Sequence, residues 1–325
     1  MVGLEAAYNP YLTGVDGVRI KQKTVGGWKP LYLFDETIKE PENGNDIVTT
    51  IDINIQDVAE TSLMNHLLQH KADWGCAVLM EVETGNIKAI ANLTLDTNSG
   101  QYYESFNHAV GTGSDAGSTF KLASIMVALE DKVFKPTDVV RTGNGEIKYY
   151  GAKMSDSHRG GYGDITVNEV FEKSSNVGVF KMILKAYENK PQDFIDKLYA
   201  MNLNDPLGIE IKGEAIPYIK NTDDPAWSKL SLPWMSIGYE MMMTPLQILN
   251  FYNAVANDGK MVKPKFVKAV SNTGQIIEEF ETQVINEQIA SPRVIEQAQY
   301  MLEGVVLRGT AQRLKNSPYR IAGKT

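Results

Sequence analysis

The chain has 325 residues, of which 43% are hydrophobic and 22% are charged, and its formal net charge is −8. This composition indicates a folded protein with a substantial core, and the length allows one large domain beside a smaller one. The acidic balance argues against a nucleic-acid partner, because phosphate binding needs a basic surface. A single cysteine excludes an internal disulfide, and no apolar run is long enough to predict a membrane-spanning helix.

Neither a metal nor a cofactor is predicted. His66 and His70 have the i, i+4 spacing of a metal-binding pair on a helix, but no acidic partner pattern accompanies them. Cys76 lies in the apolar run 76–80 and is expected to be a small buried side chain.

Turn signals recur through the first 45 residues, at Asn9-Pro10, Gly14, Asp16-Gly17 and Gly26-Gly27. Residues 18–20 and 28–34 have β-propensity, so we expect a β-rich extension without a core of its own. The polar stretch 39–45 contains proline and glycine and is typical of a linker. It predicts a boundary between residues 1–45 and a main domain formed by residues 46–325.

The first elements of the main domain follow from hydrophobic periodicity and from capping residues. Residues 47–51 are predicted as a strand, and Asp52 as the N-cap of a helix that reaches about Gln69. The predicted buried face of that helix comprises Ile55, Val58, Ala59, Ser62, Leu63 and Leu67. Residues 74–82 and 87–92 are predicted strands on either side of a Thr-Gly-Asn turn, which indicates a β-hairpin.

The second half of the chain is mostly helical by the same criteria. An irregular region rich in glycine and tyrosine follows Pro136, and a capping-box pattern at Thr166 then begins a short helix. The remaining predicted elements are helices at 177–184, 245–257 and 292–307, a hairpin around 272–274 and a terminal strand at 319–325. Together they predict an α+β fold, in which an antiparallel sheet joins the two ends of the chain and a helical cluster packs against it.

The stretch Ala116–Leu122 contains a Ser-x-x-Lys pattern, formed by Ser118 and Lys121. The apolar residues that follow have helical spacing, so we expect Ser118 in the first turn of a helix with Lys121 on the same side. A serine hydroxyl needs a base to become nucleophilic, and a lysine kept neutral by burial and a helix N-terminus can be that base. The backbone N–H groups there could stabilise an oxyanion. The pattern is short enough to arise by chance, in which case Lys121 would be an ordinary surface charge.

Two further polar elements accompany this pattern. Ser174-Ser175-Asn176 is a Ser-x-Asn sequence at a predicted helix start, and Lys324-Thr325 lies on the predicted terminal strand. Taken alone, Ser174 could be a helix cap and Asn176 a turn residue. A second Ser-x-Asn, at 105–107, precedes Ser118 and lacks the helix context. The three elements in this order are typical of β-lactamases and penicillin-binding proteins.

With these motifs, the sequence resembles the class B penicillin-binding proteins, and among them the division-specific (septal) transpeptidases. The resemblance covers nearly the whole chain. It rests on Gly3-Leu4-Glu5, Leu12-Thr13-Gly14, Thr50-Ile51-Asp52 with Ile55-Gln56, Glu83-Thr84-Gly85-Asn86-Ile87, Gly117-Ser118-Thr119-Phe120-Lys121, Lys173-Ser174-Ser175-Asn176-Val177-Gly178, Ser236-Ile237-Gly238-Tyr239, Thr244-Pro245-Leu246-Gln247, Ala256-Asn257-Asp258-Gly259 and Gly309-Thr310-Ala311.

The resemblance implies a serine transpeptidase fold, with residues 1–45 as the tail of a non-catalytic pedestal domain and residues 46–325 as the transpeptidase domain. It implies the activity of a periplasmic D,D-transpeptidase, which cross-links peptidoglycan stem peptides through a serine acyl-enzyme and is acylated by β-lactams. It further implies a single membrane anchor in the inner membrane, outside these 325 residues. The implied partners are divisome membrane proteins, including an FtsW-like glycosyltransferase.

The resemblance also implies a role for each matching residue. Ser118 would be the nucleophile, Lys121 the general base, Ser174 a proton relay to the leaving amine, Asn176 the residue that orients Lys121 and the substrate amide, and Lys324 a source of positive potential and a proton relay. Gly117, Ser175 and Thr325 would line the substrate site.

The sequence departs from the family pattern in three places. Ala116 and Leu122 stand where proline is usual, and neither position would touch a reacting atom. Thr325 closes the sequence before the glycine of the family's Lys-Thr-Gly motif, so we expect an incomplete third motif. In the family, the residues just beyond this motif supply the second N–H group that binds the oxyanion. Because loss of one such donor lowers a rate by a factor on the order of 10²–10³, a protein ending at Thr325 is expected to acylate slowly.

Two other functions are compatible with parts of the sequence. A serine β-lactamase shares the Ser-x-x-Lys pattern, but it must activate a deacylating water and normally lacks a pedestal-like N-terminal piece. A non-catalytic β-lactam-binding scaffold or sensor would keep the pocket without the chemistry. The presence of Ser118, Lys121, Ser174 and Asn176 together argues against a decayed site.

Overall fold

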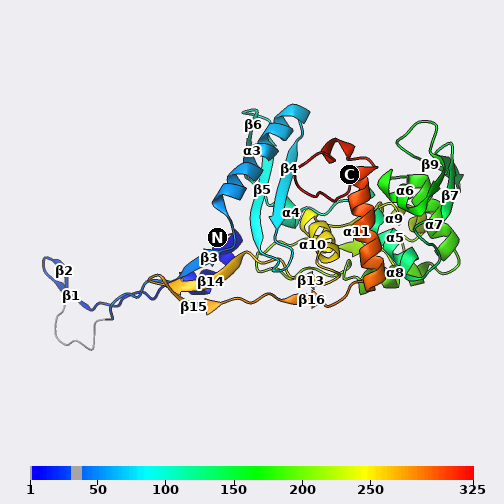
Figure 1. Cartoon of the computed structure of the whole chain (residues 1–325). Helices are drawn as coiled ribbons and strands as arrows, with labels where there is room; N and C mark the ends of the chain where they lie inside the picture. Colours follow the sequence, from blue (N-terminus) through cyan, green and yellow to red (C-terminus); the bar gives the residue numbers. More distant parts are fainter. Residues whose placement is uncertain (1, 31–38) are drawn as a thin grey trace.

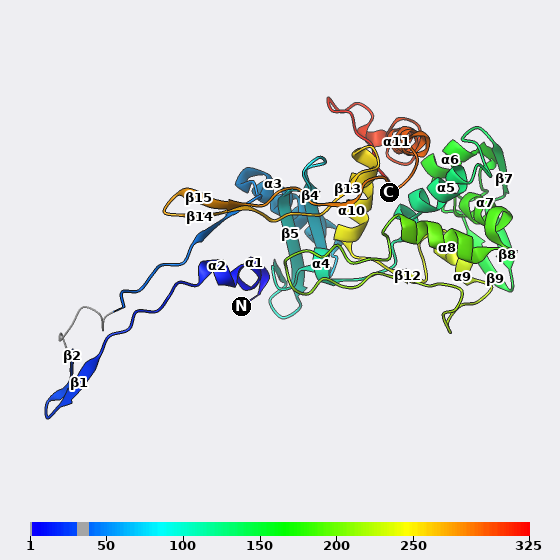
Figure 2. The same cartoon turned by 90° about the horizontal axis from the view of Figure 1, so that it is seen from below.

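The computed structural model describes residues 2–30 and 39–325 (Figure 1). An extended arm carries a small N-terminal hairpin away from the body of the protein (Figures 1 and 2). In the body, the three-stranded antiparallel sheets lie at one end, and a cluster of helices with short strand pairs lies at the other. This arrangement confirms the predicted α+β class.

The described N-terminal part contains α1 (Gly3–Ala7), α2 (Asn9–Leu12), β1 (Lys21–Thr24) and β2 (Gly27–Pro30). Two short helices therefore precede the hairpin in the predicted β-rich extension. Pro10 suits the first turn of α2, where its missing N–H would have no helical partner, so this turn signal begins a helix. The strand predicted at 18–20 is wrong, since Val18 makes only an isolated bridge to Lys39. The predicted strand at 28–34 extends beyond Pro30, outside the described residues.

Two three-stranded antiparallel sheets form the sheet end of the body. One has the order β15-β14-β3, with β3 at Asp46–Thr49, β14 at Val267–Asn272 and β15 at Gln275–Glu279. The other has the order β4-β5-β6, with β4 at Trp74–Met80, β5 at Ile87–Asp96 and β6 at Gln101–Tyr103. Both predicted hairpins are confirmed. Cys76, predicted to be buried, is only partly buried.

Helix α3 (Ile53–His70) packs on the β4-β5-β6 sheet, and Asp52 caps it as predicted by accepting from the backbone N–H groups of Asn54 and Ile55. Ala59 and Leu67 are its buried residues. Val58 and Ser62 are exposed, so their predicted place on the buried face is wrong. The sheet covers only a narrow stripe of the helix surface, and Val58 and Ser62 lie to one side of that stripe.

The helical cluster surrounds α5 (Lys121–Glu130), whose residues from Lys121 to Leu129 are all buried. The cluster also contains the short helix α6 (Val167–Glu172) and the longer helices α7 (Asn176–Tyr187), α8 (Pro191–Ala200), α10 (Pro245–Ala256) and α11 (Pro292–Leu307). The capping boxes predicted at Thr166 and Thr244 are both formed. A helix that is apolar on all sides is stable only in an interior, which accounts for the central position of α5.

Shorter elements complete the body: α4 (His108–Gly111), α9 (Ser231–Met235), β7 (Val139–Gly143), β8 (Glu146–Tyr149), β9 (Ala152–Ser155), β10 (Gly163–Thr166), β11 (Tyr218–Ile219), β12 (Met241–Met242), β13 (Met261–Val262), β16 (Val284–Asn286), and the 3₁₀ turns η2 (Gly117–Thr119) and η3 (Gln312–Leu314). The region after Pro136, predicted as irregular, contains the antiparallel pairs β7-β10 and β8-β9.

The terminal strand predicted at 319–325 is wrong. Those residues adopt no regular secondary structure, and the backbone N–H of Gly323 donates to the carbonyl oxygen of Leu302 on α11 at 3.1 Å. β-Propensity indicates only that a segment suits a strand, and a strand exists where a neighbouring backbone pairs with it. The two ends of the described chain therefore do not meet in one sheet, and β3 instead has β14 as its neighbour. Within the described ranges, no helix is long and apolar enough to cross a bilayer.

Candidate active site

Ser118 lies in η2, a 3₁₀ turn that leads directly into α5, rather than in the first turn of the α-helix itself. Gly117 begins the turn with φ +54°, a conformation that favours glycine. Its backbone N–H donates to the carbonyl oxygen of Gly238 at 2.8 Å. The hydroxyl of the partly buried Tyr252 donates to the Thr119 carbonyl oxygen at 2.7 Å. The turn that presents Ser118 is thus held from two other segments of the chain.

Gly238 has φ +86° and lies against the nucleophile turn so closely that no side chain would fit there. A Cβ at this position would come within 2.1 Å of the carbonyl oxygen of Gly117. The sequence drew attention to Gly238 only through family resemblance. Its physical role depends on the contact between Gly117 and Gly238, which lie far apart in the sequence.

Lys121 is the first residue of α5, and its side chain is fully buried. Its Nζ donates to the backbone carbonyl oxygen of Ser174 at 2.7 Å and to Asn176 Oδ1 at 2.5 Å, and it lies 3.1 Å from Ser174 Oγ. The carbonyl and amide oxygens can only accept, so they take two N–H bonds of the lysine. In the neutral amine the lone pair then remains for a hydroxyl.

The environment of Lys121 favours this neutral form. Burial and, to a smaller extent, the positive charge of Lys324 lower the pKa of Lys121 to about 7, with the carboxylate of Asp156 acting in the opposite direction. An ammonium group loses its hydration in such a site, while a neutral amine loses much less. Near neutral pH the amine can therefore accept a proton.

Ser174 lies between α6 and α7 in the left-handed region, with φ +57°. This conformation turns its carbonyl oxygen toward Lys121 while its hydroxyl lies between the two lysines, 3.1 Å from Lys121 Nζ and 2.9 Å from Lys324 Nζ. The hydroxyl can accept from one lysine and donate to the other, as a proton relay requires.

Ser175, and not Ser174, is the N-cap of α7. Its hydroxyl accepts from the Gly178 backbone N–H at 2.9 Å and donates to the Asp156 carboxylate at 3.0 and 3.1 Å. The residue is fully buried. It was expected to line the substrate site, but its side chain instead faces the interior and holds α7.

Asn176, the first residue of α7, is oriented by the end of β9. Its Nδ2 donates to the carbonyl oxygen of Ser155 at 2.8 Å, which leaves Oδ1 toward Lys121. The neighbouring Asp156 also accepts from the Val177 backbone N–H at 3.0 Å. Sequence reasoning missed Asp156, which stands alone in a glycine- and tyrosine-rich stretch and approaches the site only through the packing of β9 on α7.

Lys324 reaches the same group of side chains from the other end of the chain. Burial lowers the pKa of Lys324 to about 8, and its ammonium lies 5.9 Å from the ring centre of Phe171. The exposed Thr325 has its hydroxyl 2.6 Å from that of Thr310. Although the predicted terminal strand is absent, Lys324 reaches the hydroxyl of Ser174.

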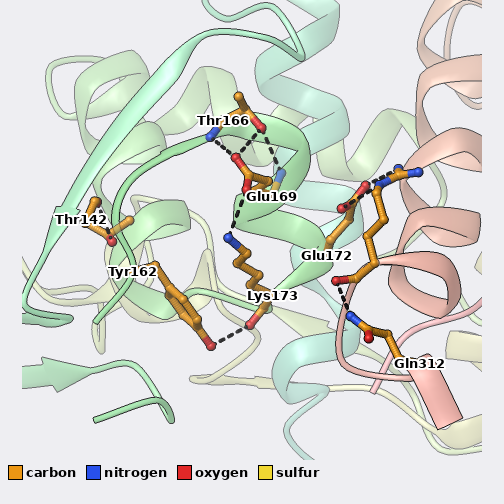
Figure 3. A network of polar contacts seen from close by, with 9 residues as sticks. Thr142, Tyr162, Thr166, Glu169, Glu172, Lys173 and Gln312 are labelled. Atoms are coloured by element: carbon orange, nitrogen blue, oxygen red, sulfur yellow. Dashed lines mark hydrogen bonds and ion pairs between the residues drawn. The ribbon is translucent and has the colours of Figure 1, made fainter. Parts of the chain in front are cut away.

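Polar contacts brace the segment that leads from α6 to Ser174 (Figure 3). The Lys173 ammonium donates to Glu169 at 2.9 Å, and the Tyr162 hydroxyl donates to the Lys173 carbonyl oxygen at 3.1 Å. The buried carboxylate of Glu172 pairs with Arg308 at 2.5 Å. These contacts hold the backbone just before Ser174 to α6 and α11.

The structure thus brings Lys121, Ser174, Asn176 and Lys324 together, and Ser118 stands one turn before Lys121. Among the described residues, no hydrogen bond joins the Ser118 hydroxyl to Lys121. Catalytic hydrogen bonds are often long before a substrate binds, so this geometry is compatible with proton transfer. No group of three or more His, Cys, Asp or Glu side chains in the described ranges could hold a metal ion.

Comparison with known proteins gives a consistent result. Residues 75–325 match the family described as the penicillin binding protein transpeptidase domain. The chain is similar to a protein named peptidoglycan D,D-transpeptidase FtsI from Buchnera aphidicola subsp. Schizaphis graminum, with 30% identity over 264 residues, which cover 79% of this chain and 44% of that protein. A protein of the same name from Escherichia coli K12 is 27% identical over 328 residues, which cover 99% of this chain and 52% of that protein.

Solved structures show the same relationship. The apo form of penicillin binding protein 3 from Mycobacterium tuberculosis has a TM-score of 0.76 and 26% identity, covering 99% of this chain and 66% of that chain. The TP domain of penicillin-binding protein 3 from Burkholderia pseudomallei has a TM-score of 0.70 and 26% identity, and the match covers 85% of this chain and 76% of that chain. The chain spans about half the length of the curated relatives it matches. It belongs to the penicillin-binding protein transpeptidase domain family.

Proposed function

We propose that this chain carries the acyl-transfer site of a peptidoglycan D,D-transpeptidase that works in septal cell-wall synthesis. The observation that supports this most directly is the fully buried amine of Lys121, whose two acceptor oxygens are provided by Ser174 and Asn176. Such an amine is a base at neutral pH, one turn away from a partly exposed serine hydroxyl. The names of the relatives support the substrate class and the septal role.

In the acylation step, Ser118 Oγ attacks the carbonyl carbon of the penultimate D-Ala of a stem peptide, and Lys121 takes the hydroxyl proton. The C–N bond to the terminal D-Ala breaks as the ester forms. The leaving amine receives a proton through the Ser174 hydroxyl, which lies within hydrogen-bond distance of both lysines. An amine of a neighbouring stem peptide then attacks the ester by the reverse sequence of proton transfers.

Lys324 provides positive charge where the terminal carboxylate of the donor peptide would lie, and its charge also lowers the pKa of Lys121. We propose that Thr325 and the backbone of Gly117 contact the substrate, and that Ser175 acts by positioning α7. β-Lactams would acylate Ser118 in place of the donor peptide, since they present an amide carbonyl next to a carboxylate.

The whole protein is proposed to act at the periplasmic face of the inner membrane, with divisome membrane proteins as partners, including an FtsW-like glycosyltransferase. This part of the proposal rests on family membership and on the names of the relatives.

The decisive experiment is intact-mass analysis after exposure to a fluorescent penicillin, with the modified residue mapped by peptide sequencing. We expect one adduct per chain on Ser118 and none on Ser118→Ala, because the nucleophile of a cooperative set cannot be replaced. Release of D-Ala from an N-acylated D-Ala-D-Ala peptide would establish the donor reaction. Rapid turnover of nitrocefin without a stable adduct would instead indicate a β-lactamase, and an unmodified protein would indicate a scaffold.

A further inference from the structure

A cavity of about 540 Å³ lies outside the candidate active site, a volume within the range of small-ligand sites. It is formed by the tip of the β8–β9 hairpin, the junction between α7 and α8, and the loop before α9. The candidate active site is at the first residue of α7 and the cavity at its last turn. Because α7 has 12 residues, the two sites are separated by about 18 Å.

The hairpin at the rim of this cavity contains a strained tyrosine. Tyr149 pairs with Ala152, and the two residues between them, Tyr150 and Gly151, have φ +45° and +83°. A two-residue turn with both central residues left-handed favours Asn-Gly or Gly-Gly, so tyrosine at the first position is costly. The Tyr150 side chain is 60% exposed, so burial does not offset this cost. Strained residues cluster at functional sites, so the position of Tyr150 at the rim of a cavity motivates a hypothesis about its side chain.

The lining combines flat aromatic rings with hydrogen-bonding groups. The ring centroids of Tyr149 and Tyr150 lie 4.6 Å apart in an edge-to-face arrangement, and Trp227 forms another wall of the cavity. The Tyr149 hydroxyl donates to the Glu188 carboxylate at 3.0 Å, and the Lys229 ammonium lies 4.7 Å from the ring centre of Tyr150. Asn189 also lines the cavity.

This lining matches the two sides of a sugar ring. The C–H face of a pyranose packs on an aromatic ring, while its hydroxyl and N-acetyl groups bond to carboxylate, amide and ammonium side chains. An aliphatic peptide side chain would instead require a dry apolar wall. Lys229 adds a positive charge at the rim, suited to a ligand that carries carboxylates.

We propose that this cavity binds a glycan strand of the cell wall, an aminosugar polymer whose rings stack on Tyr150 and Trp227. The inference rests on the proposed function, because the stem peptides that would react at Ser118 are attached to such a polymer. A glycan bound at one end of α7 would keep its peptides near the candidate active site at the other end.

The test is a fluorescence-polarisation measurement with labelled glycan strands from which an amidase has removed the stem peptides. We expect Tyr150→Asn and Trp227→Ala to weaken binding at least tenfold, and Tyr150→Phe to bind within about twofold of the wild type. Tyr150→Asn should also raise Tm by about 2 °C, because asparagine relieves the backbone strain. Weaker binding by a more stable protein excludes misfolding as the cause.

Thr273→Asn is the matched control. Thr273 and Gly274 form another two-residue turn of the same kind, with φ +48° and +84°, in the β14–β15 hairpin. This variant should gain similar stability and bind glycan as the wild type does. Unchanged glycan binding by Tyr150→Asn would overturn the proposal. It would also be overturned if free stem peptide displaced the labelled glycan strand and unlabelled glycan strand did not. Penicillin labelling of the same samples separates the two proposals: wild-type protein that is labelled but binds no glycan refutes only the glycan site.

Discussion

Lys121 Nζ and the backbone carbonyl oxygen of Ser174 are joined by a hydrogen bond of 2.7 Å across 53 residues of sequence. The bond depends on the left-handed backbone at Ser174, because an α-helical or extended residue there would direct its carbonyl elsewhere. The base is therefore positioned by backbone geometry as well as by the side chains of the motif.

The rate of β-lactam acylation should depend on pH in a bell shape. Protonated Lys121 cannot accept the Ser118 proton, so the rate should rise as pH increases through about 7, the pKa of that lysine. It should fall as pH increases through about 8, where Lys324 loses the charge that attracts a carboxylate. Stopped-flow acylation between pH 5.5 and 10 measures both limbs. A rate that is flat from pH 6 to 9 would exclude Lys121 as the base.

The two adjacent serines should respond differently to replacement by alanine. Ser174→Ala removes the proposed relay, so acylation should slow by about 10²–10³-fold with little change in Tm. Ser175→Ala removes a buried N-cap and leaves Asp156 short of a donor, which should destabilise the fold by about 1–2 kcal/mol. Thermal unfolding and penicillin-labelling kinetics on both variants make the comparison. The labelling rates are compared under conditions in which the same fraction of each variant is folded. Equal rates for the two variants would contradict the assignment of Ser174 as the relay and Ser175 as a structural cap.

Gly238→Ala should displace the nucleophile turn. The new Cβ would come within 2.1 Å of the Gly117 carbonyl oxygen, at a residue with φ +86°, so the backbone must move. We expect a destabilisation of about 2–4 kcal/mol and at least a tenfold loss of labelling rate. Gly208→Ala is the control, because Gly208 has φ +66° with no atom within 4 Å of a new Cβ. It should lose about 1 kcal/mol from strain alone and keep its labelling rate.

The two arginine–carboxylate pairs near α11 should contribute unequally to stability. Glu172 is 3% exposed, so Arg308→Ala leaves a buried carboxylate without its partner and should cost about 2–3 kcal/mol. Arg320 is 83% exposed and pairs with Glu303 at 2.7 Å, so Arg320→Ala should cost less than about 1 kcal/mol. Urea unfolding of the two variants measures the difference. Adding Glu172→Gln to Arg308→Ala should recover part of the loss, and no recovery would mean that the buried charge is not its cause.

Local signals were sufficient for much of the fold. Asp52, Thr166 and Thr244 cap their helices as predicted, because a cap is made within one turn and needs no distant partner. The two predicted hairpins formed for the same reason, since a turn determines the register of its own strands. The residues of the three motifs could also be identified as site candidates, because the recognition of a motif depends only on residue types and their order along the chain.

Tertiary structure decided what depends on contact between distant segments. The hydroxyl of Ser174 faces two lysines while that of Ser175 faces Asp156, and the sequence does not distinguish these neighbours. Residues 319–325 have the composition of a strand but no strand partner in the described chain, and Lys324 still reaches Ser174. Burial sets the pKa of Lys121, and burial belongs to the packed helical cluster rather than to any single stretch of sequence.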